Sequence, residues 1–561
     1  MNASPPPLQA ASLQDPRYYL LNVRAVLDWV GERHADLLLP SELERLAAFA
    51  AMEAEAQALL VRLVMRSHDS YRLATLRYPE IAPDLEPWAR KLAAADWLEL
   101  DPPLGVDTLG RLLRAGELRS AAQACLDRAR WPASARKSDW VAALAEAFPG
   151  EARSLPQWWP AVPGAGPVVQ LTAVTRQWFR RLRLMFFGNL RQDWSEFVLT
   201  ELGHQRYEPV IFDREARAFQ ARTEIDQYLL LADLGEQLAA GSPVAELWPT
   251  IPAAAEGPWL ARRHSRLLLE AGMVAERQGE TALAMAAYQA SSHPEAALRG
   301  LRLREKQMTA EALWPEVSAA LAASWPEAER QGLHRIARRV ARRAGLAWQA
   351  PVPPAIPERE LVLARDSALS VEQSAAAALT DDDSCCVYVE NHLFNGLLGL
   401  LCWPAIYEAV PGAFFHPFQA GPADLYRPEF TERRAALLEA CLASLDDGGY
   451  QDRIWHTWRT RHGTSCPLIV WPVLNEDTVR LALDCIAPTA LKAILQRLLA
   501  DLRQHRSGLP DLVRFWPAQR RFALIEVKGP GDRLQDHQRA WLDYCRRHGL
   551  DAEVLHVRWA A

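Results

Sequence analysis

The chain has 561 residues, of which 50% are hydrophobic and 24% charged, and its formal net charge is −6. This length and composition predict several globular domains and exclude a disordered, collagenous or coiled-coil protein. No apolar run reaches the roughly 18 residues of a membrane span, and Met1–Asp15 lacks the features of a secretory signal. The eight cysteines show neither CxxC nor Cys/His zinc spacing, so we expect reduced thiols and a cytoplasmic location.

Helical periodicity dominates the first part of the chain. Apolar residues recur at helical spacing from Tyr18 to about Leu100, as in Leu59-Leu60-Leu63-Val64, which predicts a helical region over 1–100. Asp101-Pro102-Pro103 interrupts this pattern, and short helices are predicted over the next segment, 101–155. Because basic residues lie beside it, that small module could contact a DNA backbone, and a helical packing module without a ligand is the alternative.

The middle of the chain, 168–350, is also predicted to be helical and is bounded by two proline-rich linkers. The linkers are 155–167 and 350–357. Within this region Arg262–Arg304 has the pattern of a helix–turn–helix unit, with residues at offsets typical of a tetratricopeptide repeat. These residues are Gly279, Ala282, Ala286, Tyr288 and Pro294.

The last part of the chain, 358–561, mixes helical and strand patterns, which predicts an α/β domain. The predicted helices are Ser374–Thr380, Val387–Leu401, Ala435–Leu445 and Val479–Arg503. The predicted strands are Pro467–Val473, Asp511–Trp516, Phe522–Val527 and Glu553–Trp559. The overall prediction is therefore a multidomain protein with a mostly helical first two-thirds and a C-terminal α/β domain.

Two predicted strands flank Pro517–Arg520 and therefore predict a β-hairpin. If Ala518-Gln519 forms the turn, the register places Asp511 opposite Glu526, and opposed Cβ atoms lie about 4.5–5.5 Å apart. Two carboxylates at that distance repel each other unless one is protonated or a cation lies between them. Lys528 leaves the same face of the strand as Glu526, because it lies two residues further along.

This group of charges favours metal-assisted chemistry on a phosphodiester. Mg²⁺ binds one or two carboxylates together with water and phosphate oxygens, and a nearby lysine can orient the water and stabilise negative charge. The chain has only five lysines among its 63 basic residues, which makes a lysine here less attributable to chance. An ordinary Glu526/Lys528 pair on a surface hairpin is the alternative.

Two arginine-rich segments are candidate phosphate-binding surfaces, with a solvated helix face as the alternative for each. The segments run from Arg176 to Arg191 and from Arg330 to Arg343, and neither contains an acidic residue. The candidate DNA-binding residues are Arg176, Arg180, Arg181 and Arg183 in the first segment and Arg335, Arg338, Arg339 and Arg342 in the second.

The hairpin motif resembles the virus-type replication-repair nuclease (VRR-NUC) domain, a branch of the PD-(D/E)xK restriction-endonuclease-like fold. The resemblance lies in Pro510-Asp511, in Glu526-Val527-Lys528 and in the segment from Gly529 to Trp541. Other segments resemble the Fanconi anaemia-associated nuclease family. They are Tyr18–Val23, Leu59–Leu63, Trp403–Tyr407, Phe418-Gln419 and Pro422–Leu425. The order of a helical DNA-binding region, a SAP-like module, a tetratricopeptide-like region and a nuclease domain also matches, and the lack of a ubiquitin-binding zinc finger indicates a bacterial-type member.

The resemblance implies a structure-selective nuclease that cuts near the base of 5′ flaps, has 5′-to-3′ exonuclease activity and acts in repair of DNA interstrand crosslinks. The cofactor implied is Mg²⁺ or Mn²⁺, with two ions, and the partner is branched or flapped double-stranded DNA at the bacterial nucleoid. By motif position, Asp511, Glu526 and the carbonyl of Val527 are metal ligands and Lys528 is the catalytic lysine. Glu390 fits the place of a further helical glutamate in the family's site.

Several alternatives stay open at this point. Gln538, on the predicted helix after the hairpin, is a candidate support for the site or a helix-surface amide. His392 and His537 are more typical of structural histidines, Asp381–Asp383 of a solvated loop, and Cys385-Cys386 of core thiols. A Holliday-junction resolvase is a second enzyme that the VRR-NUC resemblance permits, and a helical scaffold with an inactive nuclease domain is the non-enzymatic alternative.

Overall fold

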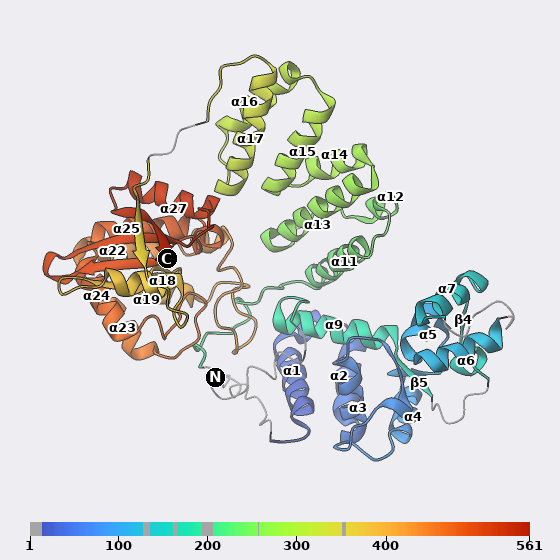
Figure 1. Cartoon of the computed structure of the whole chain (residues 1–561). Coiled ribbons are helices and arrows are strands. Elements are labelled where there is room, and N and C mark those ends of the chain that lie inside the picture. The colour runs from blue at the N-terminus through green and yellow to red at the C-terminus, as the bar shows by residue number, and fades with distance from the viewer. Residues whose placement is uncertain are drawn as a thin grey trace. The chain divides into compact units, whose positions relative to one another are not determined.

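The computed structural model describes residues 14–126, 135–160, 167–192, 194, 206–255, 257–350 and 355–560 (Figure 1). The predicted linkers include 161–166 and 351–354, which lie outside the described residues. Contacts divide the chain into two compact units, one of Met1–Ala218 with Pro411–Ala420 and one of Phe219–Val410 with Gly421–Ala561. None of the described helices is long and apolar enough to cross a membrane.

The first unit begins with helices that pack on a small antiparallel sheet. The helices are α1 (Tyr18–His34), α2 (Pro40–Ala51), α3 (Ala54–Val64), α4 (Glu86–Ala94) and, later, α9 (Ala173–Phe187). The strands are β1 (Ser70–Arg72), β2 (Leu98–Leu100) and β5 (Val168–Leu171), in the order β1-β5-β2. The predicted helix starting at Val168 is wrong there, because Val168 and Val169 are β-branched and fully buried in the central strand.

A small helical module forms a second part of the first unit. Its helices are α5 (Val106–Leu112), α6 (Ala115–Cys125), α7 (Lys137–Ala147) and α8 (Leu155–Trp158), and its strands are β3 (Leu104–Gly105) and β4 (Ala152–Arg153). Leu109, Leu118, Leu144 and Trp158 are completely buried in its core. The short helices expected after Asp101 are thus confirmed, with a two-stranded ribbon in addition.

The second unit opens with antiparallel helices that follow one another in space as they do in the chain (Figure 1). They are α11 (Arg222–Ala239), α12 (Val244–Leu247), α13 (Gly257–Gln278), α14 (Thr281–Ala290), α15 (Pro294–Gln307), α16 (Ala310–Ala322) and α17 (Glu327–Arg343). Gly272 allows α13 and α14 to pack closely, because a Cβ at this position would lie 2.4 Å from the ring of Tyr288. The expected helix–turn–helix pattern over Arg262–Arg304 is confirmed.

A five-stranded mixed sheet forms the centre of the C-terminal part. Its order is β6-β10-β9-β8-β7, and β10 runs parallel to both of its neighbours while β8 runs antiparallel to β9 and β7. The strands are β6 (Glu358–Leu363), β7 (Cys385–Tyr388), β8 (Leu512–Trp516), β9 (Arg521–Lys528) and β10 (Ala552–Trp559).

Helices cover both faces of this sheet. On one face α18 (Val371–Leu379) packs against Leu512, Ile525 and Val527, and on the other a larger core contains Val513, Leu524 and α27 (Asp536–Arg547). The remaining helices are α19 (His392–Leu401), α20 (Trp403–Ile406), α21 (Glu429–Arg433), α22 (Ala435–Asp447), α23 (Tyr450–Arg461), α24 (Glu476–Cys485), α25 (Pro488–Ala500) and α26 (Leu502–His505). The two-sided cover buries β9 along almost its whole length.

Two predictions in this part are wrong. Pro467–Val473 forms turns rather than a strand, because Pro467 and Pro472 have no N–H to donate to a sheet. The predicted helix Val387–Leu401 begins only at His392, because the residues before it form strand β7, which pairs with β8. Both errors come from short apolar runs, which do not distinguish a strand from a buried helix by periodicity.

Candidate active site

The hairpin of β8 and β9 has the register predicted from the sequence. Phe515 pairs with Phe522 and Leu512 with Ile525, so Asp511 lies one step beyond β8, opposite Glu526. The carboxylate Oδ2 of Asp511 accepts a hydrogen bond of 2.9 Å from the backbone N–H of Val527. This bond ties the Asp511 side chain to the strand that carries the other charged residues of the motif.

Glu526 and Lys528 form a buried ion pair at the end of β9. Lys528 Nζ donates to Glu526 Oε1 at 2.7 Å, and the side chains are 9% and 0% exposed. Lys528 Nζ also donates to Oε1 of Gln538 on α27 at 3.1 Å. The alternative of an ordinary pair on a surface hairpin is therefore wrong, and Gln538 contacts the site lysine directly.

Glu390 joins this group from the turn between β7 and α19. Its N–H donates to the backbone carbonyl of Asp511 at 2.8 Å, and its Oε2 accepts a hydrogen bond of 2.8 Å from the Tyr388 hydroxyl. The expectation that this glutamate lies on a helix is wrong: Glu390 has a φ of +39°, a left-handed conformation that non-glycine residues seldom adopt. Such conformations are often found at functional sites.

Burial raises the pKa values of the two facing carboxyls, Asp511 and Glu526. Burial raises the pKa of Glu526 to about 7, and the charge of Asp511 adds to that effect. Burial likewise raises the pKa of Asp511 to about 6, with smaller contributions from Glu372 on α18 and from Glu390. Lys528 opposes both shifts, but a single ammonium does not balance four carboxyl groups.

The site has the chemistry of a partly built cation-binding centre. Glu526 Oε2 is buried and has no hydrogen-bond partner among the described residues, a costly arrangement that a cation would relieve. Within the described residues, no group of three or more His, Cys, Asp or Glu side chains already forms a metal cage. A hard cation needs only one or two carboxylates when water and phosphate oxygens complete its coordination, so the donor set fits such an ion.

The arginines of the first candidate DNA-binding segment lie on α9 and are half-buried. Arg181 forms an ion pair of 2.5 Å with Glu42, and Arg176 and Arg183 donate to backbone carbonyls of Leu171 and Leu190. Intramolecular contacts thus account for these three side chains. A DNA contact by this group, Arg180 included, stays a prediction.

The arginines of the second segment lie on α17 and are exposed. Arg339 and Arg343 both pair with Glu305 at 2.7 Å, and Arg335 lies 3.6 Å from Asp536 on α27. Within the described part of the chain, no ion pair is found for Arg338 or Arg342. These two guanidinium groups are therefore the most available to phosphates.

Sequence reasoning missed two residues at the site. Glu372 lies in the first turn of α18, and its charge raises the pKa values of Asp511 and Glu526. Tyr388 is the hydrogen-bond partner of Glu390. Nothing in the spacing of either residue relates it to the hairpin, because the sheet brings together segments more than 100 residues apart. Two other candidate groups have structural contacts: Asp381 pairs with Arg514 at 2.7 Å, and His537 packs against Gly508.

Three family models match the chain. The VRR-NUC domain matches residues 445–559, the FAN1 HTH domain matches residues 17–99, and the Fanconi anemia-associated nuclease SAP domain matches residues 103–158. The VRR-NUC match contains the β8–β9 hairpin and α27, whereas β6, α18 and β7 precede it. Nucleases of this type are generally dependent on a divalent metal.

Relatives match over very different lengths. The chain is 43% identical to the Fanconi-associated nuclease 1 homolog of Pseudomonas aeruginosa over 99% of this chain and 98% of that protein. It is 26% identical to Fanconi-associated nuclease 1 of Homo sapiens over 96% of this chain and 62% of that protein. A crystal structure of paFAN1 bound to 2nt 5′flap DNA with gap superposes with a TM-score of 0.86 at 43% identity, over 98% of this chain and 100% of that one. The chain belongs to the Fanconi-associated nuclease family.

Proposed function

We propose that this structure-selective DNA nuclease cuts 5′ flaps, digests DNA from 5′ to 3′ and acts in repair of interstrand crosslinks. Its reaction would be hydrolysis of a phosphodiester bond at the end of the β8–β9 hairpin. The observation that carries the proposal is the unpartnered, buried Oε2 of Glu526, opposite Asp511 and beside Lys528. The likeness to paFAN1, whose structure contains 5′ flap DNA, supports the choice of substrate.

The cofactor we propose is Mg²⁺ or Mn²⁺, with two ions, held by Glu390, Asp511, Glu526 and the backbone carbonyl of Val527. When bound, such ions polarise the phosphoryl oxygen and lower the pKa of a coordinated water. The backbone bonds around Asp511 support the assignment, because they fix its carboxylate and the Glu390 turn before any ion arrives. Binding of the ions would also favour the ionised forms of Asp511 and Glu526, whose pKa values burial raises to about 6 and about 7.

Lys528 is proposed as the catalytic lysine. An ammonium has three N–H donors. Lys528 directs one to Glu526 and one to Gln538, which leaves the third for a phosphoryl oxygen or the attacking water. The two accepting side chains hold the ammonium in place, so little motion is needed as negative charge develops on the phosphoryl group. Gln538 is thereby a positioning residue.

We divide the chain into a DNA-binding domain over 1–100, a SAP-like module over 101–155, a tetratricopeptide-like region over 168–350 and the nuclease domain over 358–561. DNA binding is proposed for the three regions that precede the nuclease domain. Phosphates would contact exposed arginines of α17, with Arg338 and Arg342 the most available, and those of α9 that DNA displaces from internal partners. An enzyme of this kind would work on chromosomal DNA in the bacterial cytoplasm.

The test is cleavage of end-labelled 5′ flap, Holliday junction and plain duplex substrates with Mg²⁺, with Mn²⁺ and with a chelator. Metal-dependent incision near the base of the flap, together with 5′-to-3′ digestion, supports the proposal. Symmetrical cutting of the junction in preference to the flap would favour a resolvase. Binding of all three substrates without cleavage would favour a scaffold with an inactive nuclease domain.

A further inference from the structure

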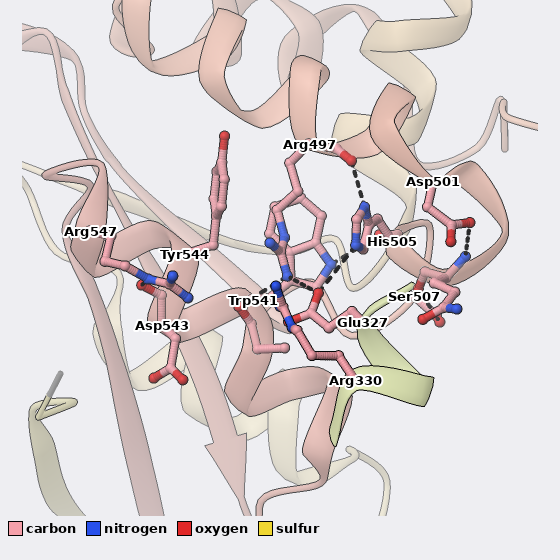
Figure 2. A network of polar contacts seen from close by, with 12 residues as sticks. Glu327, Arg330, Arg497, Asp501, His505, Ser507, Trp541, Asp543, Tyr544 and Arg547 are labelled. Carbon is pink, nitrogen blue, oxygen red and sulfur yellow. Dashed lines mark hydrogen bonds and ion pairs between the residues drawn. The ribbon is translucent and has the colours of Figure 1, made fainter. Parts of the chain in front are cut away.

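A buried ion pair joins the helical region to the nuclease domain at the first residue of α17. Figure 2 shows Glu327 entering a group of side chains from α25, α26 and α27. Its Oε2 accepts a hydrogen bond of 3.0 Å from Arg497 and lies 3.3 Å from His505 Nε2. We call Glu327, Arg497, His505 and Trp541 the α17 clasp.

The α17 clasp is more than the acidic first turn that many helices carry. Arg497 is 9% exposed, its guanidinium lies 4.8 Å from the ring centre of Trp541, and it also donates to the carbonyl of Ala540. The Glu327 side chain is only 18% exposed. The hydrogen bond from His505 lowers the pKa of Glu327 to about 2 against the effect of burial. Removing one partner of such a pair leaves the other charge buried and uncompensated.

The α17 clasp is connected to the candidate active site along two routes. Trp541 follows Gln538 by one turn of α27, and Gln538 contacts Lys528. The Trp541 indole N–H donates to the carbonyl of His505 at 2.9 Å, and the segment after His505 leads to Asp511. That segment is held closely, because a Cβ on Gly508, whose φ is +84°, would overlap the His537 side chain.

On its other side, the α17 clasp lies at the start of the helix that carries the exposed arginines. One further contact joins the two elements nearby: Arg335 lies 3.6 Å from Asp536, which begins α27. Arg338 and Arg342 follow Arg335 at helical spacing, so they share its side of α17. Helix α17 is therefore attached at two points: Glu327 contacts α25 and α26, and Arg335 contacts α27. Both attachments restrain these guanidinium groups relative to Lys528.

We propose that Glu327 is a positioning residue that fixes the arginine face of α17 relative to the active site and thereby sets which phosphodiester of a bound branched DNA reaches Lys528. This inference rests on the proposed function. It adds a contact between two regions of the chain, made by residues outside the active site, that controls the site of incision.

The experiment compares Glu327→Gln with Glu327→Asp and with the matched control Glu329→Gln in the full chain. Glu329 lies in the same first turn of α17 and shares its effect on the helix dipole. Its Oε2 is buried without a hydrogen-bond partner, and no hydrogen bond or ion pair joins it to the nuclease domain among the described residues. Steady-state cleavage and mapped incision positions are measured on a labelled 5′ flap with Mg²⁺. Hydrogen exchange of α17 and α27 is measured without DNA.

For Glu327→Gln we expect KM to rise about 5–10-fold with kcat within about twofold of wild type, and incision to spread to neighbouring phosphodiesters. Amide exchange in α17 should accelerate, Glu327→Asp should recover most of the wild-type pattern, and Glu329→Gln should match wild type. An unchanged KM and incision pattern in Glu327→Gln overturns the proposal, as does an equal loss of kcat on every substrate with incision positions retained. If Glu327→Gln does not fold, His505→Gln, which replaces the imidazole that contacts Glu327, decides by the same criteria.

A failure of the proposed function would give a different experimental result from a failure of the positioning role. A wild-type protein that does not cut flaps in any metal refutes the proposed function. Hydrogen exchange then still decides whether Glu327 fixes α17, since that measurement needs no cleavage. Equal exchange in wild type and Glu327→Gln would refute the positioning role by itself.

Discussion

The backbone joins Glu390 to Asp511: the N–H of Glu390 donates to the carbonyl of Asp511 at 2.8 Å, and the N–H of Val389 donates to the same oxygen at 3.0 Å. Two candidate metal ligands separated by more than 100 residues are thus held together by main-chain bonds. These bonds do not involve the carboxylates, so they remain when either side chain is replaced. Asp511→Asn would in addition keep an oxygen for the N–H of Val527, whereas Asp511→Ala removes that bond.

Asp511→Ala and Lys528→Ala should each reduce kcat for flap cleavage by at least about 100-fold while DNA affinity stays close to wild type. Asp511→Ala removes a proposed ligand, and Lys528→Ala removes the ammonium proposed to contact the reacting phosphate. Single-turnover cleavage and fluorescence anisotropy give the two quantities. Asp551→Asn is the control, since this exposed carboxylate lies at the opposite end of β9 and pairs with Arg521. Wild-type cleavage rates in either alanine variant would contradict the assignment.

Tyr388→Phe should weaken metal binding several-fold and leave kcat at saturating metal nearly unchanged. The substitution removes only the hydroxyl that donates to Glu390 Oε2, so the carboxylate loses its orientation but keeps its charge. The Mg²⁺ concentration at half-maximal cleavage measures this effect. Tyr407→Phe, which removes a hydroxyl bonded to the backbone of Ser465, serves as the control. Equal metal dependence in the two variants would show that Tyr388 does not orient Glu390.

The metal-free protein should lose stability as the pH rises through the pKa values of the site. Burial raises the pKa of Asp511 from 3.8 to about 6 and that of Glu526 from 4.5 to about 7, so the folded state binds these protons more tightly than the unfolded chain. Their stabilising contribution is complete below the unfolded values and disappears above the folded ones. Thermal unfolding with a chelator should therefore show wild type losing stability, relative to the double variant Asp511→Asn with Glu526→Gln, between about pH 4 and pH 8.

Parallel curves of melting temperature against pH for wild type and the double variant would contradict the raised pKa values of Asp511 and Glu526. Added Mg²⁺ should abolish much of the difference above pH 7, because the ion replaces the lost protons as the compensating charge. The double variant should not respond to Mg²⁺ in the same way.

Arg338→Ala combined with Arg342→Ala should weaken DNA binding and reduce the salt dependence of the binding constant by about 0.9 per lost phosphate contact. These exposed guanidinium groups lie on α17 without ion-pair partners among the described residues. Binding is titrated across a range of salt concentrations. Arg558→Ala, which removes an exposed arginine paired with Glu360, is the control. An unchanged salt slope would assign the α17 arginines to a solvated helix face.

The hairpin was predictable from the sequence in considerable detail. Its strands, its register and the opposition of Asp511 and Glu526 follow from two apolar runs around one short turn, which is local information. The positions of Lys528 and Gln538 follow from the two-residue period of a strand and from the helix after it. The long helical segments were predictable for the same reason, since their periodicity repeats over many residues.

Non-local features were not predictable. Strand β5 forms only because β1 and β2 flank it, and Val168–Leu171 alone does not reveal that pairing. Cys385–Tyr388 is a strand because β8 lies beside it, whereas its sequence continues into an apolar helix. Glu372 and Tyr388 were not recognised for the same reason, because their positions at the site depend on the order of strands in the sheet. The α17 clasp combines residues from four helices and had no signal in the sequence.

Strand β10 has a consequence for synthesis of the protein. It lies between β6 and β9, and it comes after every other strand of the sheet in the chain. While the ribosome is still making residues 552–559, β6 has no neighbour and β9 presents an open edge, so the strand bearing Glu526 and Lys528 is covered on one side only. A nascent chain would therefore carry Glu526 and Lys528 without the neighbouring strand that completes their sheet, so the proposed active site can be assembled only after translation of β10.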